Sequence, residues 1–286
     1  MTEDRYPQAS IHDVRVTATD LDHAESLNFG PDGFCYAGGE DGQVYRLRAG
    51  EPPETYARTG GGIGGVCLDG DGNLYACNYG RAAVHRVTPE GTVSTYSSGT
   101  DEVPATEPNY AVFDAHGYLY YSDSGSYYRP TGRLHVVAPS GETSLLFGGH
   151  LHYPNGLAID PEGAWLYLVQ STAPNVTRFP MTGPGRVGEP EIYVKLRDVV
   201  PDGLAFAASG NLYVACYTPD VILRIRPNRF VETVVADPGS DILNRPTNVA
   251  FEPGSTNLWF ANFGGHTIGS LDVGEPGASL HLPHLG

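Results

Sequence analysis

Short apolar runs alternate with turn sequences along the chain, and the same order of polar and apolar positions recurs six times. Each copy starts with a polar residue or glycine, continues through an apolar run to a tight turn rich in Gly, Asp and Pro, and then enters a second apolar run with aromatic residues. Strands favour aromatic and β-branched residues, and tight turns favour glycine. Each copy therefore predicts strand, turn, strand, loop and strand.

The six copies start 39 to 47 residues apart, which is the period of a propeller blade. Their first residues are Glu25, Gly64, Asn109, Asn155, Asp202 and Thr247. A β-sandwich with coincidental turns is the alternative. Six copies in phase instead favour an all-β, six-bladed β-propeller with four-stranded antiparallel blades.

Each of the first five copies is followed by a candidate outer strand, with the sequences ETYAR, VSTYSS, TSLLF, EIYVKL and VETVVA. The sixth copy is followed only by SLHLPH at 279–284. The segment IHDVRVTATD at 11–20 is a spare strand that can pair into the last blade and close the ring. No second domain is indicated, so residues 1–286 are predicted to form a single propeller domain.

Charge and composition restrict the partners. The formal net charge of the chain is −16, and its 17 Lys and Arg residues are scattered. Nucleic acids and anionic membranes need a clustered basic patch. No signal peptide and no apolar run of membrane-spanning length is visible. We expect a cytoplasmic protein that takes a small-molecule substrate and no nucleic acid or membrane, as a monomer, with a dimer as the alternative.

Several kinds of site are disfavoured by the motifs. Cys35, Cys67, Cys77 and Cys216 lie in apolar runs without C-x-x-C or zinc spacing, which predicts buried thiols, with a Cys67–Cys77 bridge as the alternative. Neither a nucleophile elbow nor a phosphate-binding loop is present. The run GGGIGG at 60–65 precedes a strand and no helix, so we expect it to pack closely at the channel.

The first residues of the copies carry the candidate chemistry. In a propeller the first strand of each blade lines the central channel, so equivalent residues at its start form a ring. Four members of this ring are carboxylates or carboxamides, namely Glu25, Asn109, Asn155 and Asp202. Two carboxylates forced together raise a pKa unless a cation lies between them. An all-oxygen set suits Ca²⁺, and also Mg²⁺ or Mn²⁺, better than zinc. Polar strand caps facing channel water are the alternative.

These residues also carry a resemblance to the senescence-marker-protein/gluconolactonase family, which includes regucalcin and bacterial lactonases. The resemblance spans about residues 21–270 and rests on Glu25, on YPNGLAID with Asn155, and on VPDGLAFAASGNLYVACY with Asp202. Strictosidine-synthase-like and paraoxonase-like propellers share parts of it. It implies a metal held by Glu25, Asn155 and Asp202, lactone hydrolysis with Asp202 doubling as base, and an Asn109 that touches metal-bound water or substrate.

One motif departs from the family pattern. The sugar-lactone members have an Arg two residues before the equivalent of Asn109, in an R-x-N-D-G run, whereas this chain reads EPNYA from Glu107. An acid thus replaces the Arg that binds sugar hydroxyls. This disfavours a polar sugar lactone as the substrate and leaves the expected metal ligands intact.

The loops after the second strand of each blade are expected to surround the mouth of the channel. The longest, at 122–132, contains Asp123, Tyr127, Tyr128 and Arg129 and is a candidate lid, with an ordinary exposed turn as the alternative. The candidate substrate contacts are Asn109, Glu107, Tyr128, Arg129, His152, Tyr217 and His266. His152 is also a candidate general base, although such histidines are more often satisfied loop residues.

The sequence therefore favours a metal-dependent hydrolase that opens a lactone or related ester, with Asp202 as the catalytic base. Two alternatives keep the same scaffold. One is a biosynthetic enzyme that condenses, isomerises or cleaves its substrate without water. The other is a calcium-binding propeller without enzymatic activity.

Overall fold

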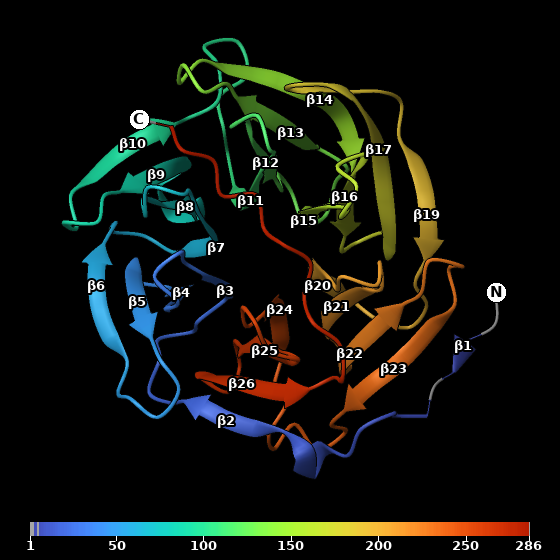
Figure 1. Cartoon of the computed structure of the whole chain (residues 1–286). Coiled ribbons are helices and arrows are strands. Elements are labelled where there is room, and N and C mark those ends of the chain that lie inside the picture. The colour runs from blue at the N-terminus through green and yellow to red at the C-terminus, as the bar shows by residue number, and fades with distance from the viewer. Residues whose placement is uncertain (1–2, 5, 286) are drawn as a thin grey trace.

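Six sheets are arranged in a ring around a central axis in the computed structural model, which describes residues 3–4 and 6–285 (Figure 1). In each sheet the strand that begins a copy of the repeat lies at the axis, and the outermost strand lies at the rim. This arrangement confirms the predicted six-bladed β-propeller.

The first three blades each contain four strands in chain order. Blade 1 contains β3 (Ser26–Phe29), β4 (Cys35–Gly38), β5 (Gln43–Leu47) and β6 (Glu54–Arg58). Blade 2 contains β7 (Ile63–Leu68), β8 (Leu74–Asn78), β9 (Ala83–Val87) and β10 (Val93–Ser97). Blade 3 contains β11 (Pro108–Phe113), β12 (Leu119–Asp123), β13 (Gly132–Val137) and β14 (Thr143–Leu151).

Blades 4 and 5 each carry a short extra strand, and an N-terminal strand completes blade 6. Blade 4 contains β15 (Pro154–Ile159), β16 (Trp165–Gln170), β17 (Asn175–Gly183) and β19 (Glu191–Lys195), with the short β18 (Arg186–Val187). Blade 5 contains β20 (Pro201–Phe206), β21 (Leu212–Tyr217), β22 (Asp220–Ile225) and β23 (Val231–Ala236), with β1 (Glu3–Asp4) paired in parallel to β23. Blade 6 contains β24 (Pro246–Phe251), β25 (Asn257–Asn262), β26 (Thr267–Asp272) and β2 (Arg15–Ala18). Two short 3₁₀ helices, η1 (Ile11–Asp13) and η2 (Tyr79–Arg81), complete the elements.

The ring is closed by β2, which pairs antiparallel with β26 and places Arg15 opposite Ser270. The spare strand predicted at 11–20 therefore does close the last blade. Closure covers the edge of β26, which would otherwise present unpaired backbone groups to other chains. In addition, the Thr247 hydroxyl donates to the Glu25 carbonyl at 2.6 Å and joins blade 6 to blade 1 next to the axis.

Aromatic side chains pack neighbouring blades together. Tyr75 of blade 2 meets Phe113 of blade 3 edge to face, with ring centroids 4.9 Å apart. Tyr167 of blade 4 and Phe206 of blade 5 repeat this contact at 5.0 Å. Such pairs contribute about 0.5–1.5 kcal/mol beyond the burial of their area. The repeated aromatic position of the sequence thus holds the blades in a fixed order around the axis.

The segment 279–284, which is all that follows the sixth copy, forms no strand, because β2 takes the outer place in blade 6 as predicted. The C-terminal segment 275–285 instead crosses the axis over the far ends of the inner strands (Figure 1). The Ala278 amide donates to the Phe206 carbonyl at 2.9 Å, and the Gly70 amide donates to the Pro283 carbonyl at 2.8 Å. The segment, called the strap below, therefore spans from blade 5 to blade 2.

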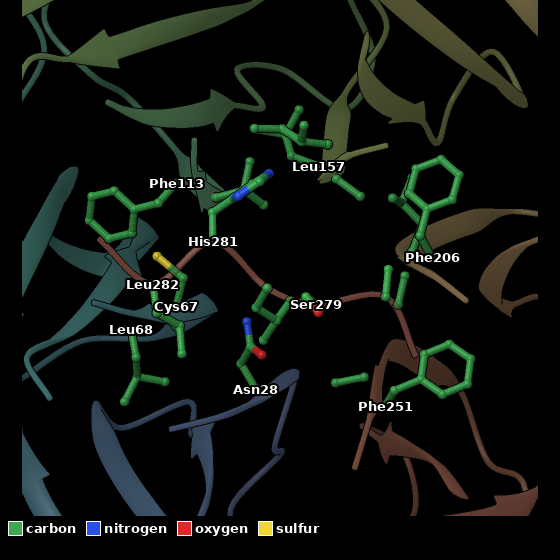
Figure 2. Close-up of a pocket in the computed structure, with 18 of the residues that line it drawn as sticks. Asn28, Cys67, Leu68, Phe113, Leu157, Phe206, Phe251, Ser279, His281 and Leu282 are labelled. Atoms are coloured by element: carbon green, nitrogen blue, oxygen red, sulfur yellow. The ribbon is translucent and has the colours of Figure 1, made fainter. Parts of the chain in front are cut away.

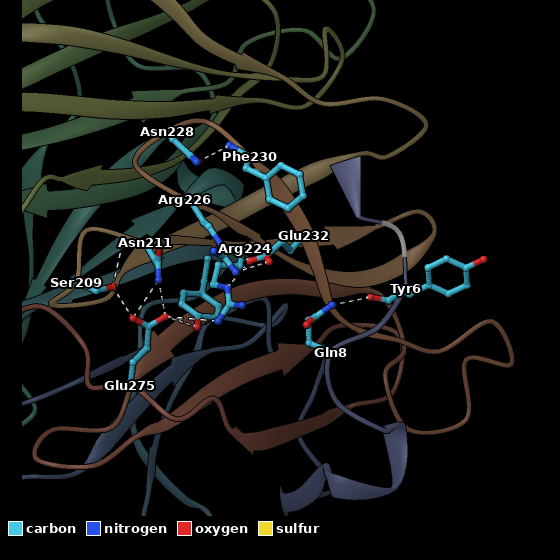
Figure 3. A network of polar contacts seen from close by, with 11 residues as sticks. Tyr6, Gln8, Ser209, Asn211, Arg224, Arg226, Asn228, Phe230, Glu232 and Glu275 are labelled. Atoms are coloured by element: carbon cyan, nitrogen blue, oxygen red, sulfur yellow. Dashed lines mark hydrogen bonds and ion pairs between the residues drawn. The ribbon is translucent and has the colours of Figure 1, made fainter. Parts of the chain in front are cut away.

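Polar contacts hold both ends of the strap. Glu275 accepts hydrogen bonds from the Tyr213 hydroxyl at 2.6 Å and from Asn211 Nδ2 at 2.9 Å (Figure 3). At the other end, His284 Nδ1 lies 2.7 Å from an Asp71 carboxylate oxygen. Between these anchors, Leu280 and Leu282 help to line an apolar cavity of about 100 Å³ beneath the strap (Figure 2). The strap thus covers the far end of the channel.

Two further sequence expectations can be compared with the structure. The four cysteines are buried free thiols, as predicted. Among the described residues, no helix has the length and apolar character that crossing a bilayer requires.

Candidate active site

The ring residues of blades 2 to 6 are each the second residue of their inner strand: Gly64, Asn109, Asn155, Asp202 and Thr247. In all five strands the pairing register shifts at this point, so the ring residue lies in a β-bulge. Bulges re-aim side chains and are frequent beside functional sites. In blade 1, Glu25 directly precedes β3 and its amide donates to the Gly38 carbonyl at 3.2 Å.

Local sequence explains the position of these bulges. A proline precedes the ring residue in four blades, namely Pro108, Pro154, Pro201 and Pro246. Proline has no amide donor and suits the first residue of a strand or a bulge. The glycine after the ring residue permits close approach, since a Cβ at Gly156 would lie 2.6 Å from the Asp202 carbonyl oxygen. The PNG and PDG runs are therefore strand starts packed against the next blade, not turns.

The bulges open onto a cavity of about 320 Å³ at the near end of the channel. Glu25, Asn155, Asp202 and Thr247 line it from four different blades. Asn155 and Asp202 are almost fully buried, with 3% and 5% of their surface exposed, and Glu25 is half-buried. The fold therefore brings together the three residues predicted as principal metal ligands.

Both carboxyl groups that line this cavity have raised pKa values. Burial, followed by the charges of Glu107 and Glu40, raises the pKa of Glu25 to about 8. Burial and then the charge of Glu25 raise the pKa of Asp202 well above its usual value, although the neighbouring amide of Asn155 opposes this rise. No basic side chain forms an ion pair with Glu25 or Asp202 within residues 3–4 and 6–285.

Carboxylates in this arrangement fit a divalent cation. Their charged forms are costly to bury unless a positive charge lies between them, and the donors are all oxygen, which suits Ca²⁺ or Mg²⁺. The described residues hold no cluster of three or more His, Cys, Asp or Glu side chains that could bind a metal. A metal here would therefore need the amide oxygen of Asn155 and water in addition to Glu25 and Asp202.

A second set of side chains lies two residues before the ring positions and reaches over the cavity mouth. Tyr153 and Arg245 occupy this place in blades 4 and 6, line the cavity, and have left-handed backbones with φ of 53° and 50°. In blade 3 the same place is taken by Glu107. The Tyr153 hydroxyl donates to Glu107 Oε1 at 2.5 Å. Burial and the Glu107 carboxylate raise the pKa of Tyr153, which keeps its phenol protonated.

Asp123 holds the backbone of Glu107 in place through hydrogen bonds. This buried carboxylate accepts hydrogen bonds from the Glu107 amide at 2.6 Å and from the Thr106 hydroxyl at 2.8 Å. Burial alone would raise its pKa, but the nearby His135 ring and hydrogen bonds from Glu107 and Thr106 outweigh this effect and lower the pKa. Asp123 therefore belongs to the base of its loop and supports the 106–107 backbone.

The loop at 122–132 places one tyrosine in the cavity and one in solvent. Tyr127 lines the cavity, and its hydroxyl lies 3.4 Å from the hydroxyl of Tyr217, which also lines it. Tyr128 is 91% exposed and does not line the cavity, and its neighbour Arg129 is also exposed. The loop thus reaches the mouth through Tyr127.

Other predicted contact residues lie outside this cavity lining. Asn109 is buried in the blade 3 bulge, and the backbone amide of the exposed His152 donates to Gln170 Oε1 at 2.8 Å. The ring of His266 lies 4.0 Å from that of His23, at the junction between blades 6 and 1.

Sequence reasoning missed four lining residues: Tyr153, Thr218, Arg245 and Phe263. All four had a usable signal. Tyr153 and Arg245 lie at a constant offset from the ring position, whereas Thr218 and Phe263 lie in loops after the second strand of blades 5 and 6, which are expected at the mouth. The left-handed turns that direct Tyr153 and Arg245 inward carry no such signature, because neither residue is glycine.

Comparison with known proteins gives a consistent picture. A sequence model described as the SMP-30/Gluconolactonase/LRE-like region matches residues 39–262. The lactonase drp35 of Staphylococcus aureus (strain bovine RF122 / ET3-1) is 27% identical over 154 residues, which cover 51% of this chain and 48% of the relative. Protein STRICTOSIDINE SYNTHASE-LIKE 3 of Arabidopsis thaliana is 23% identical over 160 residues, covering 51% and 40%. The chain thus spans about half the length of the curated relatives that it matches.

Solved structures of other proteins share the propeller fold over most or all of this chain. The calcium-binding protein regucalcin from Agrobacterium tumefaciens superposes with a TM-score of 0.80 at 16% identity, covering 100% of this chain and 99% of that one. A gluconolactonase from Xanthomonas campestris gives a TM-score of 0.76 at 17% identity, covering 91% and 88%. At these identities the likeness shows the shared fold.

Proposed function

Because the chain belongs to the SMP-30/gluconolactonase/LRE-like family, we propose that it is a metal-dependent hydrolase that opens a lactone or a related ester in the near-end cavity. Lactonase-named relatives support a hydrolase of the lactonase type in general terms. The observation that carries the proposal for this chain is the pair of carboxylates, Glu25 and Asp202, that line one cavity without a basic partner among the described residues.

Glu25, Asn155 and Asp202 would hold the cation, with Ca²⁺ as the first choice because all three donors are oxygens. When bound, the ion would polarise the substrate carbonyl and lower the pKa of water beside it. The cation would also keep Glu25 and Asp202 ionised, which Asp202 needs in order to act as a base at neutral pH.

Asp202 would accept a proton from the attacking water as the water oxygen bonds to the carbonyl carbon. The carbon–oxygen bond of the lactone ring then breaks, and the proton passes to the leaving alkoxide, which gives a hydroxy acid. The amide of Asn155, which lines the same cavity and whose Nδ2 donates to the Ser171 hydroxyl at 3.3 Å, would orient that carboxylate. Tyr127 and Tyr217 would restrict water at the mouth, where their hydroxyls meet.

The test is hydrolysis of a lactone panel, from sugar lactones to apolar ones, after chelation and after restoring Ca²⁺, Mg²⁺, Mn²⁺ or Zn²⁺. Activity that returns with an oxygen-preferring cation, and that falls by at least about 100-fold in Asp202→Ala, is expected. Equal small losses in Asp202→Ala and Tyr217→Phe would contradict the role of Asp202.

Product mass separates this proposal from the alternatives. Hydrolysis adds one water to the substrate, whereas condensation, isomerisation or elimination does not. Metal binding without turnover of any ester would favour a calcium-binding propeller instead.

A further inference from the structure

The mouth of the cavity is surrounded by aromatic rings. Of the residues that line the cavity, Tyr127, Tyr153, Tyr217 and Phe263 are aromatic and come from blades 3, 4, 5 and 6. The rings of Tyr127 and Tyr153 meet at 5.0 Å with an interplanar angle of 70°. We call these four side chains the aromatic collar.

Each tyrosine hydroxyl of the collar has a hydrogen-bond partner within the protein. The hydroxyls of Tyr127 and Tyr217 lie 3.4 Å apart, and the Tyr153 hydroxyl donates to Glu107 at 2.5 Å. Phe263 has no polar atom in its side chain. A flat apolar ring entering the mouth would meet ring faces and edges from four blades.

Glu107 holds one ring of the collar in position. Its backbone is held by Asp123, and its carboxylate is half-buried against Tyr153. An acid fixed in this way orients a tyrosine ring over the cavity. Of the cavity-lining residues, Arg245 alone is basic, and it lies at the exposed rim.

From this geometry we propose that the collar selects a lactone carrying a fused aromatic ring over a polyhydroxylated lactone. The inference rests on the proposed hydrolase function, since the collar surrounds the same carboxylates. Aromatic rings prefer edge-to-face or offset contacts, and an apolar ring gains further from leaving water. Tyr127, Tyr153, Tyr217 and Phe263 are then the specificity-determining residues.

The experiment compares three lactones that share one six-membered ring: δ-valerolactone, glucono-δ-lactone and isochroman-3-one. They differ in carrying no substituent, hydroxyl groups or a fused benzene ring. The leaving group of isochroman-3-one is a benzylic alcohol and not a phenol, so its reactivity stays close to that of δ-valerolactone. We expect a kcat/KM for isochroman-3-one at least about tenfold above δ-valerolactone, and the lowest value for glucono-δ-lactone.

Two adjacent tyrosines give a matched pair of variants. Tyr127→Ala removes a collar ring and should lower the isochroman-3-one to δ-valerolactone ratio by about fivefold or more. Tyr128→Ala removes an equal side chain that is 91% exposed, and should leave the ratio unchanged. A wild-type preference for glucono-δ-lactone, or equal ratios in both variants, would overturn the inference.

A binding measurement separates this inference from the proposed function. The lactams 1,4-dihydro-3(2H)-isoquinolinone and δ-valerolactam have the shapes of two of the substrates but resist hydrolysis. Calorimetry should show tighter binding of the bicyclic lactam, lost in Tyr127→Ala and kept in Tyr128→Ala. That result without lactone hydrolysis would refute the hydrolase alone, and the absence of any preference would refute the collar.

Discussion

Asp123 shows how one residue connects the stability of the ring with the shape of the site. Its carboxylate accepts hydrogen bonds from the backbone amides of Thr106 and Glu107. The Glu107 side chain in turn accepts a hydrogen bond from Tyr153 and holds that ring over the cavity. A carboxylate whose pKa is lowered by folding stabilises the protein above its ordinary pKa. That contribution disappears as pH falls through the folded value.

We therefore predict that lowering the pH reduces the folding stability of the wild type more than that of Asp123→Asn. The variant should be less stable at pH 7 by about 1–3 kcal/mol, because buried donors lose a charged acceptor. Below about pH 4 its deficit should shrink, since Asp123 is then protonated in the unfolded wild type and, at still lower pH, in the folded protein as well. Thermal melts of both proteins from pH 7 to pH 3 measure this difference. A deficit that is constant with pH would assign the loss to packing.

The ring residues were predictable from the sequence and the collar only in part. The same position in three copies of the repeat is occupied by Glu25, Asn155 and Asp202. Their convergence on one cavity therefore follows from blade geometry alone. Tyr153 depends on a left-handed backbone and on a hydrogen bond to Glu107, which lies 46 residues earlier in the chain. Contacts of this kind have no local pattern.

At the scale of elements, the bulges at the start of the inner strands position the chemistry. A bulge turns a residue that would alternate between the faces of a blade toward the axis. The glycine that follows then lets the next blade approach. These two features explain why the PNG and PDG runs resemble turn signals and yet lie in strands β15 and β20.

We predict that Gly156→Ala disturbs the site more than its small size suggests. The added Cβ would lie 2.6 Å from the Asp202 carbonyl oxygen, so the blade 5 backbone has to move. Activity per folded molecule should fall at least about tenfold, because small displacements of positioned groups are costly. Steady-state kinetics and circular dichroism of the same samples separate this effect from unfolding.

Gly163→Ala is the control, since Gly163 has a positive φ of 68° in the turn at the other end of blade 4 and nothing within 4 Å of its would-be Cβ. It should cost about 1 kcal/mol of stability through backbone strain and leave activity per folded molecule unchanged. Equal effects of the two changes on activity would contradict the positional role of Gly156.

The segment 279–284 has a strand-like pattern but is not the outer strand of blade 6. Its alternation of Leu280, His281 and Leu282 is the period of a half-buried strand. Leu282 does contact the apolar cavity, but the edge of β26 is taken by β2. Competition between two segments for one edge is a property of the closed ring, and neither segment reveals it alone.

At the scale of the whole molecule, the ring separates the two ends of one channel. The strap covers the far end with apolar side chains, while the near end gathers carboxylates in a chain of net charge −16. Folding without a cation must therefore bring Glu25 and Asp202 together at a cost in free energy. A cation that binds only the folded ring would remove that cost.

We predict that Ca²⁺ raises the melting temperature of the chelated protein by several degrees, since a free cation at 100 times its Kd contributes about 2.7 kcal/mol. Glu25→Gln should melt higher than the wild type in chelator, because it removes a carboxyl group that must take up a proton on folding at neutral pH, and should lose most of the rise with Ca²⁺. Glu90→Gln removes the same charge from an exposed turn far from the cavity and should keep the full rise. A similar rise in all three proteins would mean that the cation binds elsewhere, whereas its loss in Glu25→Gln alone ties the stability of the ring to its carboxylates.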